Sequence, residues 1–232
     1  DWSSDVCSSD LSIRKYKQDE IPASLLNDLL EEAFRASTMG NMQLYSVVVT
    51  RDKQMKEKLA PAHFNQPMVK TAPVVLTFCI DLRRFTKWCE QRKATPGYNN
   101  LEWFVTGSVD ALLAAQTFCV AAEEKGLGIC YLGTTTYNPQ MIIEALELPE
   151  LVFPITTVTV GWPAEEPAQV DRLPLEAIVH EETYHDYTPE DIDRLYAYKE
   201  SLPENKQFIF ENNKETLAQV LRTYVIRKKI TK

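Results

Sequence analysis

The segment from Trp103 to Tyr137 places the strongest constraint on the fold. Its first part has apolar or small side chains on nearly every face of a helical wheel, and a helix of this kind is normally buried. It ends at Glu-Glu-Lys-Gly, where Gly126 suits a left-handed C-cap. Three of the 7 glycines fall between positions 126 and 133, which indicates a backbone shaped for a close approach. We therefore predict one central buried helix, followed directly by a short strand.

The remaining patterns predict an α+β domain. Apolar runs indicate strands at 44–50, 73–80, 127–132 and 153–160. Helical spacing or composition indicates further helices at 22–37, 52–59, 81–92, 139–146, 189–202 and 214–229. The last quarter has too few apolar residues for a core of its own, so residues 189–232 are expected to form a helical arm. Residues 1–11 show no periodicity, and we expect them to be a non-native segment.

Composition narrows the partners and the compartment. The formal net charge of −8 argues against nucleic acid or an anionic membrane as the main partner. The 5 cysteines show no metal-type spacing and several lie in apolar runs, which suggests a reducing cytoplasm. Asp110 and Gln116 make the central helix a poor membrane span. We expect a cytoplasmic protein that binds neither nucleic acid nor membrane.

The candidate functional residues lie in short polar segments, each next to a predicted apolar helix or strand. GLGICYLG (126–133) does not fit GxGxxG, and the chain has no P-loop, HExxH or GxSxG motif. Arginine lies in SIRKY (12–16) and in DRLP (171–174), and its planar fork suits a phosphate. Amide side chains at 41, 43 and 66 can read the edge of a planar heterocycle. These residue types by themselves fit several kinds of ligand.

Taken in order, the segments resemble the FMN-dependent nitroreductase family, in its flavin reductase and oxygen-insensitive nitroreductase branch. The matching stretches are SIRKY (12–16), ASTMGNMQLY (36–45), HFNQPMVKTAPVVL (63–76), GLGICYLG (126–133) and VGWPAEEPAQVDRLPLEAIVHEETY (160–184). The resemblance implies a nitroreductase-like α+β fold, with a central mixed or antiparallel sheet flanked by helices. It also implies a single FMN-binding domain over residues 12–232 and an intertwined homodimer with a C-terminal helical arm.

The resemblance also implies where FMN binds. Ser12 and Arg14, joined by Arg172, would hold the phosphate. The flavin would be contacted by a loop that comes in part from the partner subunit, and its ring would meet Gln66 and the backbone near N5. These residues are Thr38, Gly40, Asn41 and Gln43 in the loop, and Leu132, Gly133 and Thr134 beside N5. No catalytic residue and no metal ligand is predicted, because the flavin carries the chemistry.

The activity implied is a ping-pong reduction of nitroaromatics, quinones or free flavin, with NADPH or NADH as reductant. Two alternatives stay open: an FMN-binding dimer without turnover, which would be a sensor or a store, and a flavin enzyme of the same fold with another reaction. The sequence departs from the family at Asp10 and Leu11, where basic residues are usual, and at Val170, where lysine is common. The chain also ends early for the family, so we expect a shortened arm.

Overall fold

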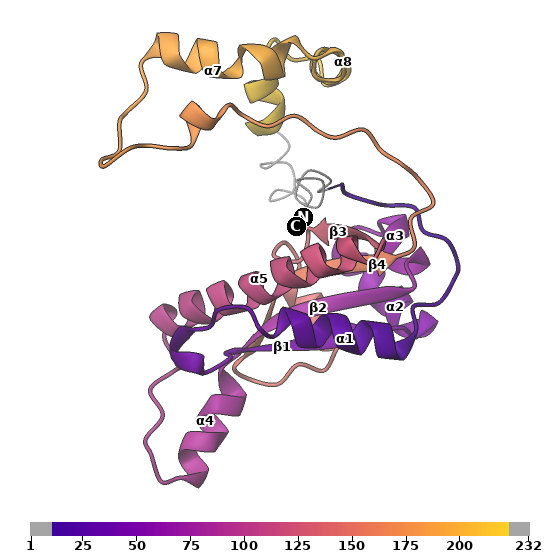
Figure 1. Cartoon of the computed structure of the whole chain (residues 1–232), viewed down its shortest axis with the longest axis vertical. Coiled ribbons are helices and arrows are strands. Elements are labelled where there is room, and N and C mark those ends of the chain that lie inside the picture. The colour runs from indigo at the N-terminus through magenta and orange to yellow at the C-terminus, as the bar shows by residue number, and fades with distance from the viewer. Residues whose placement is uncertain (1–10, 223–232) are drawn as a thin grey trace. The chain divides into compact units, whose positions relative to one another are not determined.

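The computed structural model describes residues 11–222 of the 232-residue chain (Figure 1). The chain forms two compact units, one ending at Gln169 and the other beginning at Val170. The first unit holds the sheet and every predicted flavin contact except Arg172. The second unit contains the region expected to form the arm.

A four-stranded antiparallel sheet forms the centre of the first unit. Its strands are β1 (Tyr45–Thr50), β2 (Val74–Asp81), β3 (Gly128–Leu132) and β4 (Val152–Gly161), in the order β1-β2-β4-β3. Every residue of β2 is buried, as its continuous apolar run requires of a central strand. The sheet confirms the predicted α+β class, and each strand lies within two residues of its predicted bounds.

The helices α1 (Ala23–Ala33) and α5 (Leu101–Glu124) pack together, and α5 also packs against β2. Phe118 of α5 is fully buried and lies beside Phe78 of β2, with ring centroids 6.3 Å apart. The Asn100 side chain caps the start of α5 by accepting from Trp103 N, and Gly126 takes the left-handed conformation after its end, at φ 78°. By length and composition alone α5 is able to span a membrane, but here it is the core helix of this unit.

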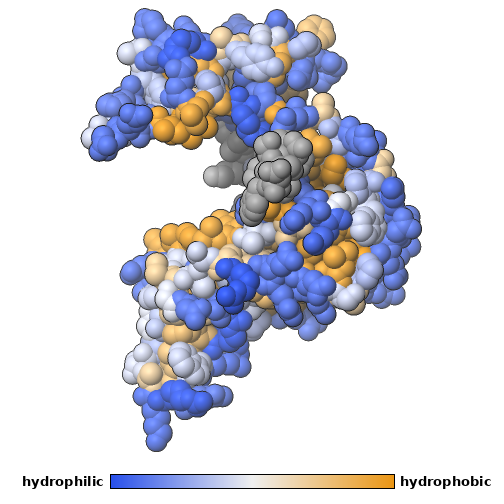
Figure 2. All heavy atoms as spheres, viewed as in Figure 1, coloured by the Kyte–Doolittle hydropathy of each residue, from blue (hydrophilic) through white to orange (hydrophobic). Residues whose placement is uncertain are grey.

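One face of α5 is not covered by the rest of the first unit. An apolar stripe, which the sequence pattern alone assigned to the interior, has exposed fractions from 42% to 77%. Val105 follows Leu101 by four residues and Val109 follows Val105 by four, and the last two members follow Val109 by three and four, so all share one side of the helix: Leu101, Val105, Val109, Leu112 and Leu113. Figure 2 shows apolar residues gathered over this part of the molecule. The helix therefore has one side in the core and one apolar side facing outward.

A second cluster of short helices packs beside β3. It consists of α2 (Lys53–Leu59), η2 (Ala60–His63), α3 (Pro67–Thr71) and α6 (Pro139–Ala145). Leu132 and Ile142 are buried inside this cluster. The helix α4 (Leu82–Gln91) follows β2 directly, and Asp81 caps it by accepting from Arg84 N. The helix α3 was not predicted, because five residues are too few to establish a period.

The N-terminal segment runs beside the edge strand β3. Ile13 N donates to Ile129 O at 2.8 Å, and Ser12 forms a parallel bridge with Ile129. A Cβ on Gly128 would lie 2.7 Å from Ile13, so only glycine allows this approach. The glycine cluster predicted a close approach to the backbone. At Gly128 the N-terminal segment of the same chain makes this approach.

The second unit consists of η3 (Leu175–Ala177), α7 (Pro189–Ser201) and α8 (Pro203–Glu211), followed by a helical turn at 217–222. A capping box between Thr188 and Asp191 fixes the start of α7. The structure confirms the helix predicted at 189–202, and α8 was not predicted. The helix predicted at 214–229 begins at 217, and its part beyond 222 lies outside the described residues.

Candidate functional site

The predicted phosphate segment is fixed by the loop that follows β4. Glu165 Oε1 accepts from Arg14 N at 2.7 Å and from Lys15 N at 3.0 Å. Ala164 N donates to Lys15 O at 2.9 Å, so side-chain and backbone bonds act together. The two hydrogen bonds to Glu165 hold the pKa of its carboxyl below the usual value, and the bond from Arg14 N has the larger effect. The acidic loop after Gly-Trp-Pro therefore fixes the backbone of the arginine segment, a role that the sequence did not reveal.

The Ser12 and Arg14 side chains project into solvent from this fixed backbone. Both residues are exposed, and Arg14 Nη1 donates to Ser12 O at 3.3 Å. A guanidinium presented in this way can donate two parallel hydrogen bonds to an anion. The two residues thus form a small cationic group beside β3.

The end of β3 carries a second polar group. The Thr134 hydroxyl lies 2.9 Å from His63 Nδ1 and 3.4 Å from Gln66 Nε2. Gln66 and Thr134 were both predicted to meet the ring, and the structure brings them together. His63, which was not predicted to be a site residue, is fully buried. The sequence gives no signal for this burial, because the hydrogen-bond partner Thr134 lies 71 positions away.

Burial lowers the pKa of His63 to about 4, so its imidazole is neutral at physiological pH. We therefore expect the free energy of unfolding to fall by about 3 kcal/mol between pH 7 and pH 4 through this residue. The unfolded chain binds the proton below about pH 6.5, whereas the folded chain resists it until about pH 4. Urea unfolding at several pH values measures the loss, and H63N should lack this part of it. An equal pH dependence in both proteins would contradict the assignment.

Asp110 holds in place the loop from Thr38 to Gln43, which was predicted to contact the flavin. This carboxylate is 2% exposed and lies in the apolar helix α5. It accepts from Thr38 Oγ1 at 2.6 Å, Met39 N at 2.9 Å and Leu44 N at 3.2 Å, and so ties both ends of the loop to the helix. These three donors satisfy a buried charge. Sequence reasoning used Asp110 only as an argument against a membrane span.

The same contacts divide the loop into a scaffold and a displayed part. Thr38 Oγ1 also accepts from Gln43 N at 2.9 Å, so this hydroxyl is used inside the loop. Gly40, Asn41 and Gln43 have φ values of 54°, 56° and 48°, which are costly for the last two. The Asn41 and Gln43 side chains are exposed and joined by a 2.7 Å hydrogen bond. The loop thus presents two amide groups outward.

The loop from Thr38 to Gln43 and the start of β3 lie at different positions along the axis of α5. The loop is anchored at Asp110, whereas β3 begins three residues after the C-cap residue Lys125. Fourteen residues from Asp110 to the end of α5 correspond to about 21 Å of helix, which separates the loop from the start of β3. The strand then runs back along α5, since the Tyr131 hydroxyl donates to Gln116 Oε1 at 3.2 Å. Arg172 belongs to the second unit, where its Nη1 donates to Asp171 O at 3.1 Å. That Arg172 joins Ser12 and Arg14 stays a prediction.

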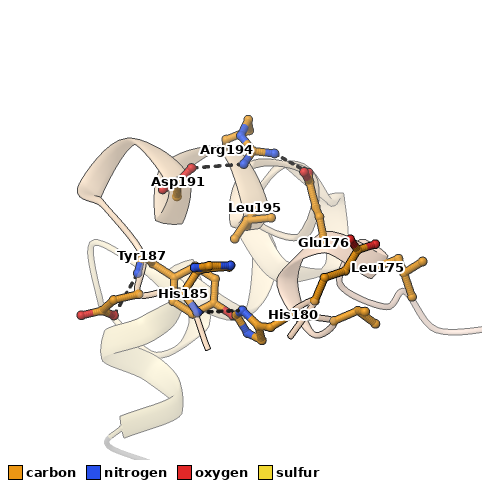
Figure 3. A pocket seen from close by; sticks show the side chains of 11 residues that line it. Leu175, Glu176, His180, His185, Tyr187, Asp191, Arg194 and Leu195 are labelled. Atoms are coloured by element: carbon orange, nitrogen blue, oxygen red, sulfur yellow. Dashed lines mark hydrogen bonds and ion pairs between the residues drawn. The ribbon is translucent and has the colours of Figure 1, made fainter. Parts of the chain in front are cut away.

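The second unit has a pocket of its own, of about 680 Å³ (Figure 3). His180 accepts from His185 N at 3.3 Å through Nδ1, and its Nε2 lies 3.1 Å from the Tyr187 hydroxyl. Arg194 pairs with Glu176 and Asp191 at the rim. These contacts use the imidazole of His180 to hold its own loop. Within residues 11–222 no group of three His, Cys, Asp or Glu side chains is placed to bind a metal.

Comparison with known proteins places the chain in a family. The model of the Nitroreductase family matches residues 11–162. The chain is 37% identical over 212 residues to an FMN reductase [NAD(P)H] of Bacillus subtilis strain 168, covering 88% of this chain and 82% of the relative.

Two solved structures agree with this. A protein of Bacteroides fragilis NCTC 9343 is 73% identical, with a TM-score of 0.92 over 93% of this chain and 88% of that one. The NfrA1 nitroreductase of B. subtilis is 29% identical, with a TM-score of 0.88 over 98% and 93%. The chain belongs to the nitroreductase family.

Proposed function

We propose that this chain is an NAD(P)H-dependent FMN oxidoreductase that reduces nitroaromatics, quinones or free flavin. One observation carries the proposal: a cationic group and a polar ring-edge group lie along the same strand. Ser12 pairs with Ile129, and Thr134 meets Gln66 just beyond the end of β3. The four residue steps from Ile129 to Gly133 span about 13 Å. This arrangement suits an elongated ligand with an anionic end and a planar, polar-edged ring.

The donor set suits FMN in particular. The exposed Arg14 guanidinium and Ser12 hydroxyl suit a phosphate. A Cβ on Gly133 would have open space around it, so a ring can approach the backbone there, and Gln66 offers both a donor and an acceptor to its edge. When bound, FMN supplies hydride and electron transfer between NAD(P)H and the acceptor. The chain itself binds the phosphate, orients the ring and keeps the His63 contact dry.

We further propose that the enzyme is a homodimer in which α5 forms the shared core. The resemblance implies that the loop with the displayed amides of Asn41 and Gln43 reaches the flavin in part from the partner subunit. The exposed apolar stripe of α5 offers the contact surface. Two copies packed through it would each complete the other's site. In this view residues 12–232 act as one FMN-binding domain, with the second unit as its arm.

The activities for which two relatives are named support the choice of reductant and cofactor. One relative is an FMN reductase that uses NAD(P)H, and another is a nitroreductase. Either NADPH or NADH fits the proposal, and the acceptor is a small molecule.

The test is a visible spectrum of the purified protein reconstituted with FMN, followed without oxygen. We expect NADPH or NADH to bleach the flavin band and a nitroaromatic to restore it. A band that does not bleach would favour a flavin-binding protein without turnover. A protein that takes up no FMN would overturn the proposal.

A further inference from the structure

Two segments distant in sequence are joined at the proposed ring edge. The turn Ala60–Gln66 meets the residues after β3 through His63 and Gln66, which both contact the Thr134 hydroxyl. Asn138 Nδ2 donates to Ala62 O at 3.1 Å, at a point away from that hydroxyl. The two segments are therefore joined by contacts at the Thr134 hydroxyl and by a separate contact at Asn138. Mutation can remove either kind of contact without the other.

The surroundings of His63 decide which of its nitrogens carries the proton. Its Nδ1 lies 2.9 Å from Thr134 Oγ1, and its Nε2 is buried with no hydrogen-bond partner among the described residues. Burial keeps the ring neutral, with a pKa of about 4. A buried acceptor without a partner is tolerated more often than a buried N–H without one. The proton therefore lies on Nδ1, and His63 donates to Thr134.

This tautomer fixes the role of the Thr134 hydroxyl. A hydroxyl oxygen has two acceptor sites and one proton. The two sites take the N–H groups of His63 and Gln66, so the proton is left to donate elsewhere. Thr134 is 6% exposed and directly follows Gly133, the residue proposed to lie against the ring. The hydroxyl is thus set as a hydrogen-bond donor at the ring edge.

The turn that holds His63 is unfavourable by itself. Phe64 and Asn65 follow it with φ values of 54° and 55°, in the left-handed region. Residues held there without glycine cost about 1 kcal/mol or more each, and such conformations persist only where the surroundings enforce them. The contact of His63 with Thr134 helps to hold this turn in place. We therefore expect its loss to shift the position of the Thr134 hydroxyl at the proposed ring edge.

We propose that His63 is a positioning residue of the flavin site, which makes Thr134 a donor to the ring and thereby raises the reduction potential of bound FMN. The inference rests on the proposed function. Donors that face a redox group favour its electron-rich, reduced form. His63 acts only through Thr134 and makes no contact with the reacting atoms.

The test measures the midpoint potential of bound FMN, together with the thermal stability of each variant. H63L and T134V should each weaken the binding of reduced FMN about tenfold relative to oxidised FMN, which lowers the potential of a two-electron couple by about 30 mV. H63N keeps a donor near the position of Nδ1 and should restore the potential. The double variant H63L/T134V should shift it no further than either single change.

The matched control is N138A, which loosens the same two segments away from Thr134. It should lower the melting temperature and leave the potential unchanged. Should H63L fail to fold, T134V carries the test, because it removes only the hydroxyl. An unchanged potential in T134V, or additive shifts in the double variant, would overturn the inference while wild type still binds FMN. A wild-type protein that binds no FMN would instead overturn the proposed function, and the inference with it.

Discussion

The V109E variant is expected to be a monomer that has lost its FMN. Val109 lies in the middle of the apolar stripe of α5 and is 52% exposed in the single chain. In a twofold dimer the change places a carboxylate in the interface twice. At about 2 kcal/mol or more for each buried charge, the dimer should be weakened by about 4 kcal/mol, roughly 1,000-fold. Because the proposed site takes its amides from the partner, flavin should leave with the partner.

Sedimentation and flavin absorbance of the same sample measure both effects. M141E is the matched control, since Met141 is an apolar residue of α6 with a comparable exposure of 42%. It should stay dimeric and keep its FMN. A V109E protein that remains a dimer would show that α5 is not the shared core, and a monomer that keeps FMN would show that one chain suffices for the site.

The R14A variant is expected to bind FMN about 30-fold more weakly. Arg14 presents an exposed guanidinium from a backbone that Glu165 holds in place. Loss of its hydrogen bonds to a phosphate should cost about 2 kcal/mol. Isothermal titration with FMN gives the affinity, and titration with riboflavin, which has no phosphate, separates the phosphate contact from the ring contact. Riboflavin affinity should be unchanged in R14A.

K17A provides the control for R14A, because it removes one positive charge from the same segment three positions away. Its affinity for FMN should stay close to that of wild type. R172A tests the second arginine in the same assay and should also weaken FMN and not riboflavin. If R14A and R172A both bind FMN as tightly as wild type does, the phosphate is held elsewhere.

Those parts of the fold that depend on local pattern could be predicted from the sequence. The strand β2 is a short run of apolar residues buried on both faces, and such a run is typical of a central strand. The end of α5 was predictable because glycine takes a left-handed conformation without a steric cost, and Gly126 does so directly after the helix. The outward stripe of α5 was not, because a helix apolar on all sides shows no preferred face.

The parts of the site that depend on distant contacts could not be predicted. Glu165 holds a backbone 151 positions away, and His63 meets a threonine 71 positions away. Asp110 looks unfavourable in an apolar helix until the loop that satisfies it is known. In each case the role of the side chain depends on a contact with a residue far away in the sequence, and a single sequence does not show which residues come into contact.

The docking of the N-terminal segment also orders events during synthesis. The backbone of Arg14 is among the first parts of the described chain to leave the ribosome, but its partner Glu165 follows 151 residues later. At translation rates of about 5–20 residues per second, that interval lasts roughly 8–30 s. The strand β3 is synthesised only in the last quarter of that interval, so for most of it the arginine segment has neither β3 nor the acidic loop beside it. If Arg14 holds the phosphate as proposed, this part of the FMN site is completed only after Glu165 has been made, so capture of FMN would follow the early folding of the nascent chain.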